Sequence, residues 1–386
     1  MINNQENTSI EAVKKPVVKN ISSGGRLQSL DFYRGLVMVL LMLESAGILR
    51  YLENVSENSR GHSLILFLFD HAKWHPLHFW DLIQPAFMFI AGSALAFSIV
   101  KQHAKKVPLQ QQWRHALKRS SWLFFWGVLD YAVSGGRLVF ELWDVLTQLS
   151  FTLLLAFAIF RWKVSYQILF SIALLALTQV LYTGFKLEGF DQPFVDQHNF
   201  GNYVDLILMN KTSPGGWVAI NCLPTAAHTI WGAALAKSLL MNSNLKNWIS
   251  KSIIAALLLL IVGYLLDYFG VAPIIKRIAT ISFTMVAGGW CILAFVFLFW
   301  WIDLKGHKRF INMFIVVGMN SIFIYLFMEI VVRYWLYDYT QVLVAGVLHL
   351  MKLPPSICKL MACIALFALE WQLCRWLYKK KIFFKL

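Results

Sequence analysis

Runs of about 20 apolar residues recur along the whole of this 386-residue sequence. A helical run of that length matches the hydrocarbon thickness of a lipid bilayer. Hydrophobic residues make up 58% of the chain and charged residues only 14%, and no soluble stretch exceeds roughly 35 residues. The sequence therefore predicts an all-α, polytopic integral membrane protein with one membrane domain.

The apolar runs predict about ten transmembrane helices. We expect them near residues 29–49, 78–100, 116–134, 141–160, 163–184, 217–240, 250–269, 278–302, 311–334 and 355–377. Residues 1–28 are polar, end in a loop-like SSGG, lack the apolar core of a cleavable signal peptide, and are expected to form a disordered tail. The membrane domain then covers residues 29–377, and residues 378–386 form a basic tail.

The net charge of +15 is typical of nucleic-acid binding, but its distribution favours another explanation. Lys and Arg concentrate in alternate connections between the expected helices, as the positive-inside rule requires. This pattern places both termini in the cytoplasm and makes anionic lipid, rather than nucleic acid, the partner of the basic loops. A bacterial inner membrane is the expected location.

Five cysteines, at positions 222, 291, 358, 363 and 374, lie within or beside apolar segments. Their odd number and lack of paired spacing indicate reduced thiols in the protein core. We expect neither a disulfide framework nor a zinc site.

One segment, FDHAKWHPLHFWDLIQPAFMFIAG from residue 69, carries a cluster of ionisable side chains directly into an apolar run. The cluster consists of His71, His75 and His78 with Asp70 and Asp81. Such groups are costly at a membrane boundary, so a functional site is the default interpretation.

The three histidines have the i, i+4, i+7 spacing of a metal-binding helix face. Pro76 interrupts any helix between them, however, and the sequence offers no fixed fourth ligand. We therefore expect no metal at this site.

Several polar residues lie inside the expected helices and need partners. Asp31 and Arg34 are spaced to pair on one helix face, and Glu44 follows Arg34 by about three helical turns on that face. Packing roles are the alternative for the remaining residues, which are His228, Asn320, Ser321 and Glu329.

Four blocks of this sequence resemble the transmembrane acetyltransferases typified by heparan-alpha-glucosaminide N-acetyltransferase and its bacterial relatives. The most specific is DHAKWHPLHFWDLIQPAFMFIAGSAL, with the family's His-Ala-x-Trp and Asp-Leu-x-x-Pro elements at residues 71–74 and 81–85. The others are SLDFYRGLVMVLLMLES from residue 29, VLTQLSFTLLLAF from residue 145 and VVGMNSIFIYL from residue 316.

The resemblance implies transfer of acetyl from cytosolic acetyl-CoA, through the membrane domain, to a glycan on the opposite side. It places the active-site histidine at His71. The sequence departs from the family where Glu44 replaces an asparagine and where Leu146, Thr147 and Gln148 replace a Leu-Gln-Arg string.

The chemistry of acyl transfer gives the candidate residues their roles. Histidine has a pKa near working pH, so His71 is the candidate general base, with Glu44 or Asp70 to orient it. Asp81 is a further catalytic candidate. Hydrogen-bond donors are needed for the oxyanion, and the candidates are Asn320, Ser321, His75 and Trp74. His78, His228 and Glu329 are further candidates for contacting the acceptor. CoA phosphates would meet Arg34 and the basic residues Arg114, Lys118 and Arg119.

The leading hypothesis is thus an acetyl-CoA-dependent acetyltransferase acting on a sugar amine or hydroxyl of a glycan at the periplasmic face. The sequence leaves open whether a covalent acetyl-histidine forms, and a homodimer is compatible with it. A proton-coupled transporter of a small solute, with Glu44, Asp81, His228 and Glu329 as a relay, is the alternative. A non-catalytic membrane scaffold would have little use for carboxylates beside histidines.

Overall fold

The computed structural model describes residues 27–57, 62–134, 136, 138–242 and 244–384. Every regular element in these residues is a helix, as the sequence predicts. The expected disordered tail, apart from its last two residues, lies outside the described part of the chain. The first described helix begins at Gln28.

The chain begins with three helices, α2 (Gln28–Ser45), α3 (Ile48–Ser56) and α4 (His62–Phe69). After a 3₁₀ turn, η2 (Phe79–Leu82), it continues through α5 (Ile83–Ala104), α6 (Leu109–Ser134), α7 (Val145–Ile159), α8 (Val164–Gly184) and α9 (Phe200–Met209). A second 3₁₀ turn, η3 (Ala219–Asn221), leads into α10 (Cys222–Met241), α11 (Leu245–Tyr268) and α12 (Ile281–Leu298).

The last third of the chain contains π-helical segments, which interrupt the regular α-helical ladder. The first of them, η4 (Phe299–Leu304), extends α12. After α13 (Ile311–Gly318) and α14 (Ser321–Leu326), a continuous run follows through η5 (Phe327–Leu336), α15 (Tyr337–Thr340), η6 (Gln341–Ala345) and α16 (Gly346–Leu350). The final helix is α17 (Pro355–Lys379).

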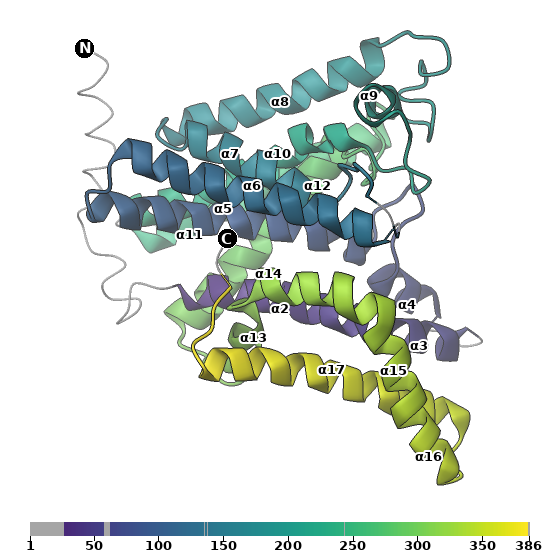
Figure 1. Ribbon diagram of the computed structural model, residues 1–386. Coiled ribbons are helices and arrows are strands. Elements are labelled where there is room, and N and C mark those ends of the chain that lie inside the picture. Colours follow the sequence, from purple (N-terminus) through teal and green to yellow (C-terminus); the bar gives the residue numbers. More distant parts are fainter. Residues whose placement is uncertain (1–26, 58–61, 135, 137, 243, 385–386) are drawn as a thin grey trace.

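The helices form two groups that lie side by side (Figure 1). The larger group contains α5 to α8 and α10 to α12, with α10 packed against α5, α7 and α8 and with α11 packed against α12. The smaller group contains α2, α13, α14 and α17, and α2 connects it to α5 and α12. The short helices α3, α4 and α9 gather at one end of the molecule.

Five helices are long and apolar enough to cross a membrane, and the number rises to seven if each of two bent pairs is counted as one span. The chain is therefore a multi-pass membrane protein by length and composition. A helix does occur within each of the ten expected segments, but α6, α7 and α10 are not among these spans. One reason is that α7 has only 15 residues, so the total of ten stays a prediction.

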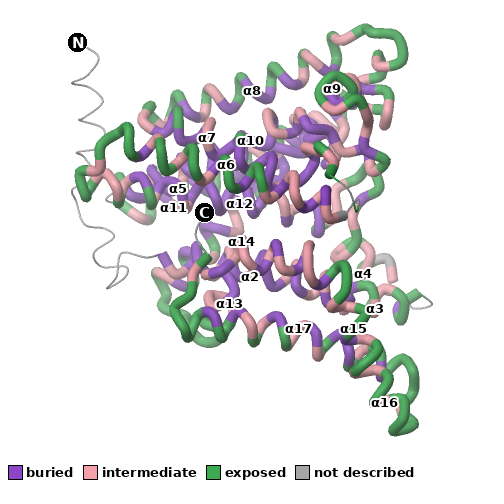
Figure 2. The backbone as a smooth tube through the Cα atoms, viewed as in Figure 1, coloured by how far each residue is buried: buried purple, intermediate pink, exposed green. Residues whose placement is uncertain are grey.

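Burial separates the central helices from the peripheral ones. In the apolar stretch of 18 residues within the span Phe79–Ala104, 67% of the residues are buried inside the protein. In the corresponding stretches of α8 and α11 only 22% are buried. Figure 2 shows exposed residues along α8. The exposed side chains of α11, such as Leu257, Leu258 and Ile261, are apolar, which fits contact with lipid rather than water.

Glycines permit the closest helix crossing in the bundle. A Cβ atom on Gly92 of α5 would lie 1.9 Å from the carbonyl oxygen of Thr229 in α10, and one on Gly232 would lie 2.0 Å from that of Phe89. The two helix backbones are therefore in contact at this crossing, as small residues allow in membrane proteins.

Both ends of the described chain reach the same end of the bundle. The start of α2 and the end of α17 lie together, opposite the end that carries α3, α4 and α9 (Figure 1). We call these the terminal end and the loop end. Termini on one side are what the charge pattern predicts, and their placement in the cytoplasm stays a prediction.

We expect Gly232→Ala to destabilise the protein by about 1–3 kcal/mol, because the added methyl group must push α10 away from α5. Gly346→Ala is the matched control, because a Cβ there meets nothing within 4 Å. Thermal unfolding of both variants in detergent measures the difference. An equal midpoint for the two variants would contradict the close crossing.

Candidate active site

The loop between α4 and η2 is organised by one buried carboxylate. The Asp81 side chain is 1% exposed and accepts hydrogen bonds from the backbone N–H of His78 at 2.9 Å and of Ala72 at 3.4 Å. A carboxylate in the first turn of η2 is also well placed for the helix dipole. Asp81 therefore fixes the loop to the start of the helix that continues as α5.

The same carboxylate binds the imidazole of His71 and the ammonium of Lys276. Asp81 Oδ1 lies 2.9 Å from His71 Nδ1 and 3.4 Å from Lys276 Nζ. Lys276 Nζ also lies 3.1 Å from His71 Nδ1. We assign a proton to Nδ1, donated to Asp81, because the carboxylate is the acceptor in the shorter contact. His71 Nε2 then carries a free lone pair.

Lys276 is the cation that balances Asp81. It lies in the loop between α11 and α12, its side chain is 8% exposed, and its ammonium is 5.4 Å from the centre of the Trp217 ring. Burial lowers the pKa of Lys276 from its ordinary value, and the nearby Asp81 and Glu44 oppose that shift. Two segments distant in sequence thus contribute to one cluster, which we call the His71 cluster: His71, Asp81 and Lys276.

The His71 cluster borders a cavity of about 440 Å³ between the two helix groups. Four carboxylates from α2, α6, the start of α7 and η5 line it, namely Glu44, Asp130, Asp144 and Glu329. The aromatic side chains in its wall are Trp80, Phe87, Tyr131, Trp143, Trp217 and Tyr325. Its size suits a small ligand, and its polar groups converge from both groups of helices.

Most of these carboxylates have a defined partner. Trp80 Nε1 donates to Glu44 at 3.2 Å, Tyr325 donates its hydroxyl to Asp144 at 3.0 Å, and Arg333 pairs with Glu329 at 2.8 Å. Paired polar groups in a shielded site are held in fixed positions.

His71 is oriented by Asp81, and not by Glu44 or Asp70, to which the sequence analysis gave this role. These two carboxylates are placed differently. Glu44 lies in the cavity wall and accepts from Trp80. Asp70 is exposed, and its side chain accepts the backbone N–H of His71 at 2.8 Å. Asp70 therefore shapes the loop backbone and does not orient the ring.

Trp74, His75 and His78 of the same segment do not line the cavity. His75 lies 3.0 Å from Asp267 in an exposed pair, and Trp74 donates to the carbonyl of Phe194 at 2.8 Å. His78 donates from Nδ1 to the carbonyl of Asp70 at 3.0 Å. The three histidines thus have three different partners, and we assign none of these residues to the oxyanion.

Three further sequence candidates lie outside the cavity wall. His228 is fully buried between α10 and α12, where its Nε2 donates to the carbonyl of Thr284 at 2.9 Å. Asn320 binds the backbone of residues 382 and 384 near the terminal end. Ser321 follows it at the start of α14.

Two of the four predicted basic residues come together. Arg119 of α6 lies near enough to Arg34 of α2 for their charges to repel. Arg34 also pairs with Asp31 at 3.8 Å. Arg114 and Lys118 are exposed on α6, where anionic lipid or phosphate can reach them.

Several charged residues of the cavity wall were not among the candidates predicted from the sequence. Asp130, Asp144 and Arg333 lie in or next to expected transmembrane segments, so an intramembrane charge was the signal that could have found them. Lys276 could not be identified as an intramembrane charge, because it lies in a short connection between two expected helices, beside another basic residue, Arg277.

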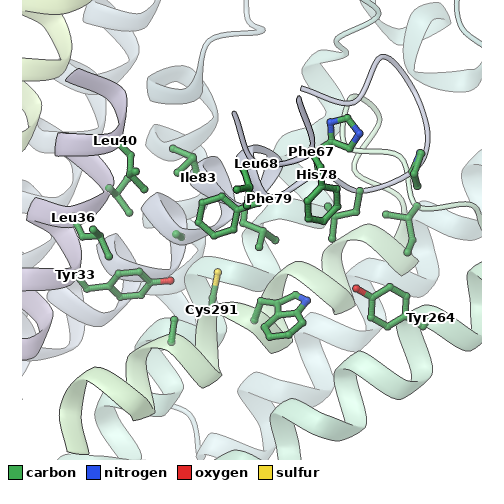
Figure 3. A pocket seen from close by; sticks show the side chains of 18 of the residues that line it. Tyr33, Leu36, Leu40, Phe67, Leu68, His78, Phe79, Ile83, Tyr264 and Cys291 are labelled. Carbon is green, nitrogen blue, oxygen red and sulfur yellow. The ribbon is translucent and has the colours of Figure 1, made fainter. Parts of the chain in front are cut away.

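A second, larger cavity of about 510 Å³ is almost wholly apolar (Figure 3). It is lined from α2 by Tyr33, Leu36 and Leu40, and from the histidine loop by His78 and Phe79. It shares Ile83 with the polar cavity. The ionisable groups that acid–base chemistry requires are concentrated in the smaller cavity, so we place the candidate active site there.

No family model matches the chain, and no curated protein shows significant similarity to it. The assignment of function therefore depends on the motifs and on the geometry of the cavity.

Asp81→Asn is expected to destabilise the protein by about 3–5 kcal/mol, because it leaves the buried Lys276 ammonium without its carboxylate. The double variant Asp81→Asn/Lys276→Met should recover part of this loss, since it removes the unpaired charge. Thermal unfolding of the two single variants and the double variant measures the coupling.

Lys211→Met serves as the control for removing a lysine from an ion pair. Lys211 pairs with Glu141 but is 35% exposed, so its loss should cost less than about 1 kcal/mol. Strictly additive effects of the Asp81 and Lys276 substitutions would contradict the pairing.

Proposed function

We propose that this membrane protein transfers an acetyl group from acetyl-CoA to an amine or hydroxyl of a sugar, with His71 as the general base. One observation carries the proposal. His71 is held through Nδ1 by a buried carboxylate, so its Nε2 is available as a base beside a polar cavity. The motif resemblance supplies the donor and the class of acceptor.

The acid–base arrangement accounts for every proton in the reaction. As the acceptor's nitrogen or oxygen attacks the thioester carbonyl, Nε2 removes its proton, and Asp81 stabilises the resulting imidazolium. The C–S bond then breaks, and the imidazolium returns the proton to the sulfur of CoA. The base is regenerated, and no covalent enzyme intermediate is required.

Lys276 is the best candidate for stabilising the oxyanion. Its ammonium lines the cavity beside His71 and carries three N–H donors. A buried cation near the developing negative charge stabilises the tetrahedral intermediate, and loss of one such donor typically costs about 3 kcal/mol. This role replaces the one that the sequence gave to Asn320.

The cavity wall favours an amino sugar as acceptor. Glu44, Asp130, Asp144 and Glu329 attract a cationic amine, which gives one proton to water or to a cavity carboxylate before the neutral amine attacks. The rings of Tyr131, Trp143 and Trp217 offer stacking surfaces. Because the His71 cluster lies at the loop end, the acceptor would come from the periplasm if the termini are cytoplasmic. The location that goes with this orientation is a bacterial inner membrane.

We expect His71→Ala to lower acetyl transfer by about 10²–10⁴-fold, the contribution typical of a general base. The measurement is acceptor-dependent release of free CoA from acetyl-CoA by purified protein. His75→Ala is the matched control, because His75 belongs to the same loop but pairs with Asp267 at the surface. Equal losses in the two variants, or full activity of His71→Ala, would exclude His71 as the base.

A proton-coupled transporter is the second candidate, and the acidic cavity favours it. Glu44 and Glu329 line the cavity together with Asp130 and Asp144, and such a cluster can relay protons. Only His228, among the residues expected for that relay, lies elsewhere.

Ligand-induced stability separates the two functions. An acetyltransferase should be stabilised by acetyl-CoA and free CoA, by about 2.7 kcal/mol at 100 times the dissociation constant. ATP at the same concentration is the control for non-specific binding of an anionic nucleotide. No stabilisation by acetyl-CoA or CoA beyond that by ATP, with pH-dependent uptake of a solute into vesicles, would favour the transporter.

A further inference from the structure

The side chain of Asn320 binds a short stretch of extended backbone at the end of the described chain. Its Nδ2 donates to the carbonyl of Ile382 at 3.1 Å, and its Oδ1 accepts the N–H of Phe384 at 3.0 Å. Asn320 is only 1% exposed. A buried asparagine therefore uses both ends of its amide to hold a segment that carries amide groups itself.

Aromatic rings complete the site that holds this segment. The Phe384 ring lies 6.4 Å from that of Trp126 in α6 and 6.5 Å from that of Phe323 in α14. The indole nitrogen of Trp126 is buried and has no hydrogen-bond partner in the described part of the chain. We call Trp126, Asn320 and Phe323 the tail site.

The tail site is next to the polar cavity, toward the terminal end. Trp126 precedes the cavity residue Asp130 by four positions, which is about one turn of α6, and Asn320 precedes the cavity residue Tyr325 by five. Figure 1 shows the chain leaving α17 and running up to the space between the two helix groups. Residues 382–384, which contact Trp126 and Asn320, therefore lie close to the cavity on its terminal-end side.

Basic residues lie beyond the tail site in the same direction. Arg119 precedes Trp126 by seven positions, so Arg119, Trp126 and Asp130 follow one stripe along α6 over about 16 Å. Gly318, two residues before Asn320, lies against Asp31 and Gly35 of α2, which places Asn320 near the level of Arg34. The two arginines thus lie beyond the tail site, on the side away from the cavity.

We propose that the tail site binds the pantetheine arm of the acetyl donor, and that residues 382–384 occupy it when no donor is bound. This inference rests on the proposed function. The pantetheine arm contains two amide groups, which can make the donor and acceptor bonds that Asn320 now makes with the backbone. Arg34 and Arg119 then face the diphosphate, and the thioester enters the cavity.

The contacts of the segment are of a kind that a ligand can displace. Ile382 is 49% exposed and Phe384 40% exposed, so neither side chain is locked in the core. Each of the two hydrogen bonds is a neutral one, which adds little net stability because the same groups can bond to water or to a ligand. Donor binding therefore competes with the segment, and weakening the segment strengthens donor binding.

The first experiment compares the binding of free CoA to the wild type, Phe384→Ala and Phe383→Ala by calorimetry. Phe384→Ala removes the ring from Trp126 and Phe323, so we expect CoA to bind several-fold more tightly. Phe383 contacts Tyr378 instead, and its substitution should leave the affinity near that of the wild type. Equal affinities of Phe384→Ala and the wild type would overturn the proposal.

The second experiment tests Asn320 in the Phe384→Ala background, where the segment no longer masks the effect. Asn320→Ala should weaken the binding of pantetheine and of CoA by a similar factor, about 30-fold for a pair of lost hydrogen bonds. Arg119→Gln should weaken CoA alone, because pantetheine has no phosphate.

The outcomes distinguish this inference from the proposed function. Weaker binding of CoA to Asn320→Ala with unchanged binding of pantetheine would overturn the amide-binding role. If CoA binds with an affinity that none of these substitutions alters, only this inference fails. Failure of every variant and of the wild type to bind CoA would overturn the proposed function as well.

Discussion

The geometry of this site depends on one buried carboxylate. Asp81 binds two backbone N–H groups of its own loop, the imidazole of His71 and the ammonium of Lys276. A carboxylate has about four lone-pair sites, and here each contact supports another part of the structure. The loop contacts fix its position, the lysine compensates its charge, and the remaining contact orients a base.

The cavity exists because two groups of helices meet without filling the space between them. Glycines bring α5 and α10 into backbone contact inside the larger group, so that group has little internal room. Polar side chains of α2, α6 and η5 instead face one another across the boundary. A boundary of this kind is where a membrane protein can keep charged groups away from lipid. Toward the opposite end of the same boundary, Asn320 holds residues 382–384.

The helical class, the helical segments and the position of His71 in an ionisable cluster at a helix boundary could all be predicted from the sequence, because each depends on local information. Apolar length predicts a helix in a membrane, and clustered ionisable residues at its boundary mark a site. The partner of His71 was harder to predict. Glu44, Asp70 and Asp81 are equivalent in a sequence, and only the bend of the loop brings Asp81 to Nδ1. Asn320 was predicted as a polar group that needs a partner, but that partner lies more than 60 residues away.

The sequence by itself determined that this chain builds apolar helices and carries its histidines at the end of one of them, since hydrophobic length and charge position act over neighbouring residues. The tertiary structure alone decided that Lys276 balances Asp81, that four carboxylates from different helices share one cavity, and that the end of the described chain reaches the space between the helix groups. These facts depend on contacts between segments far apart in the chain. Such contacts are set by helix packing, which the pattern of any single segment does not encode.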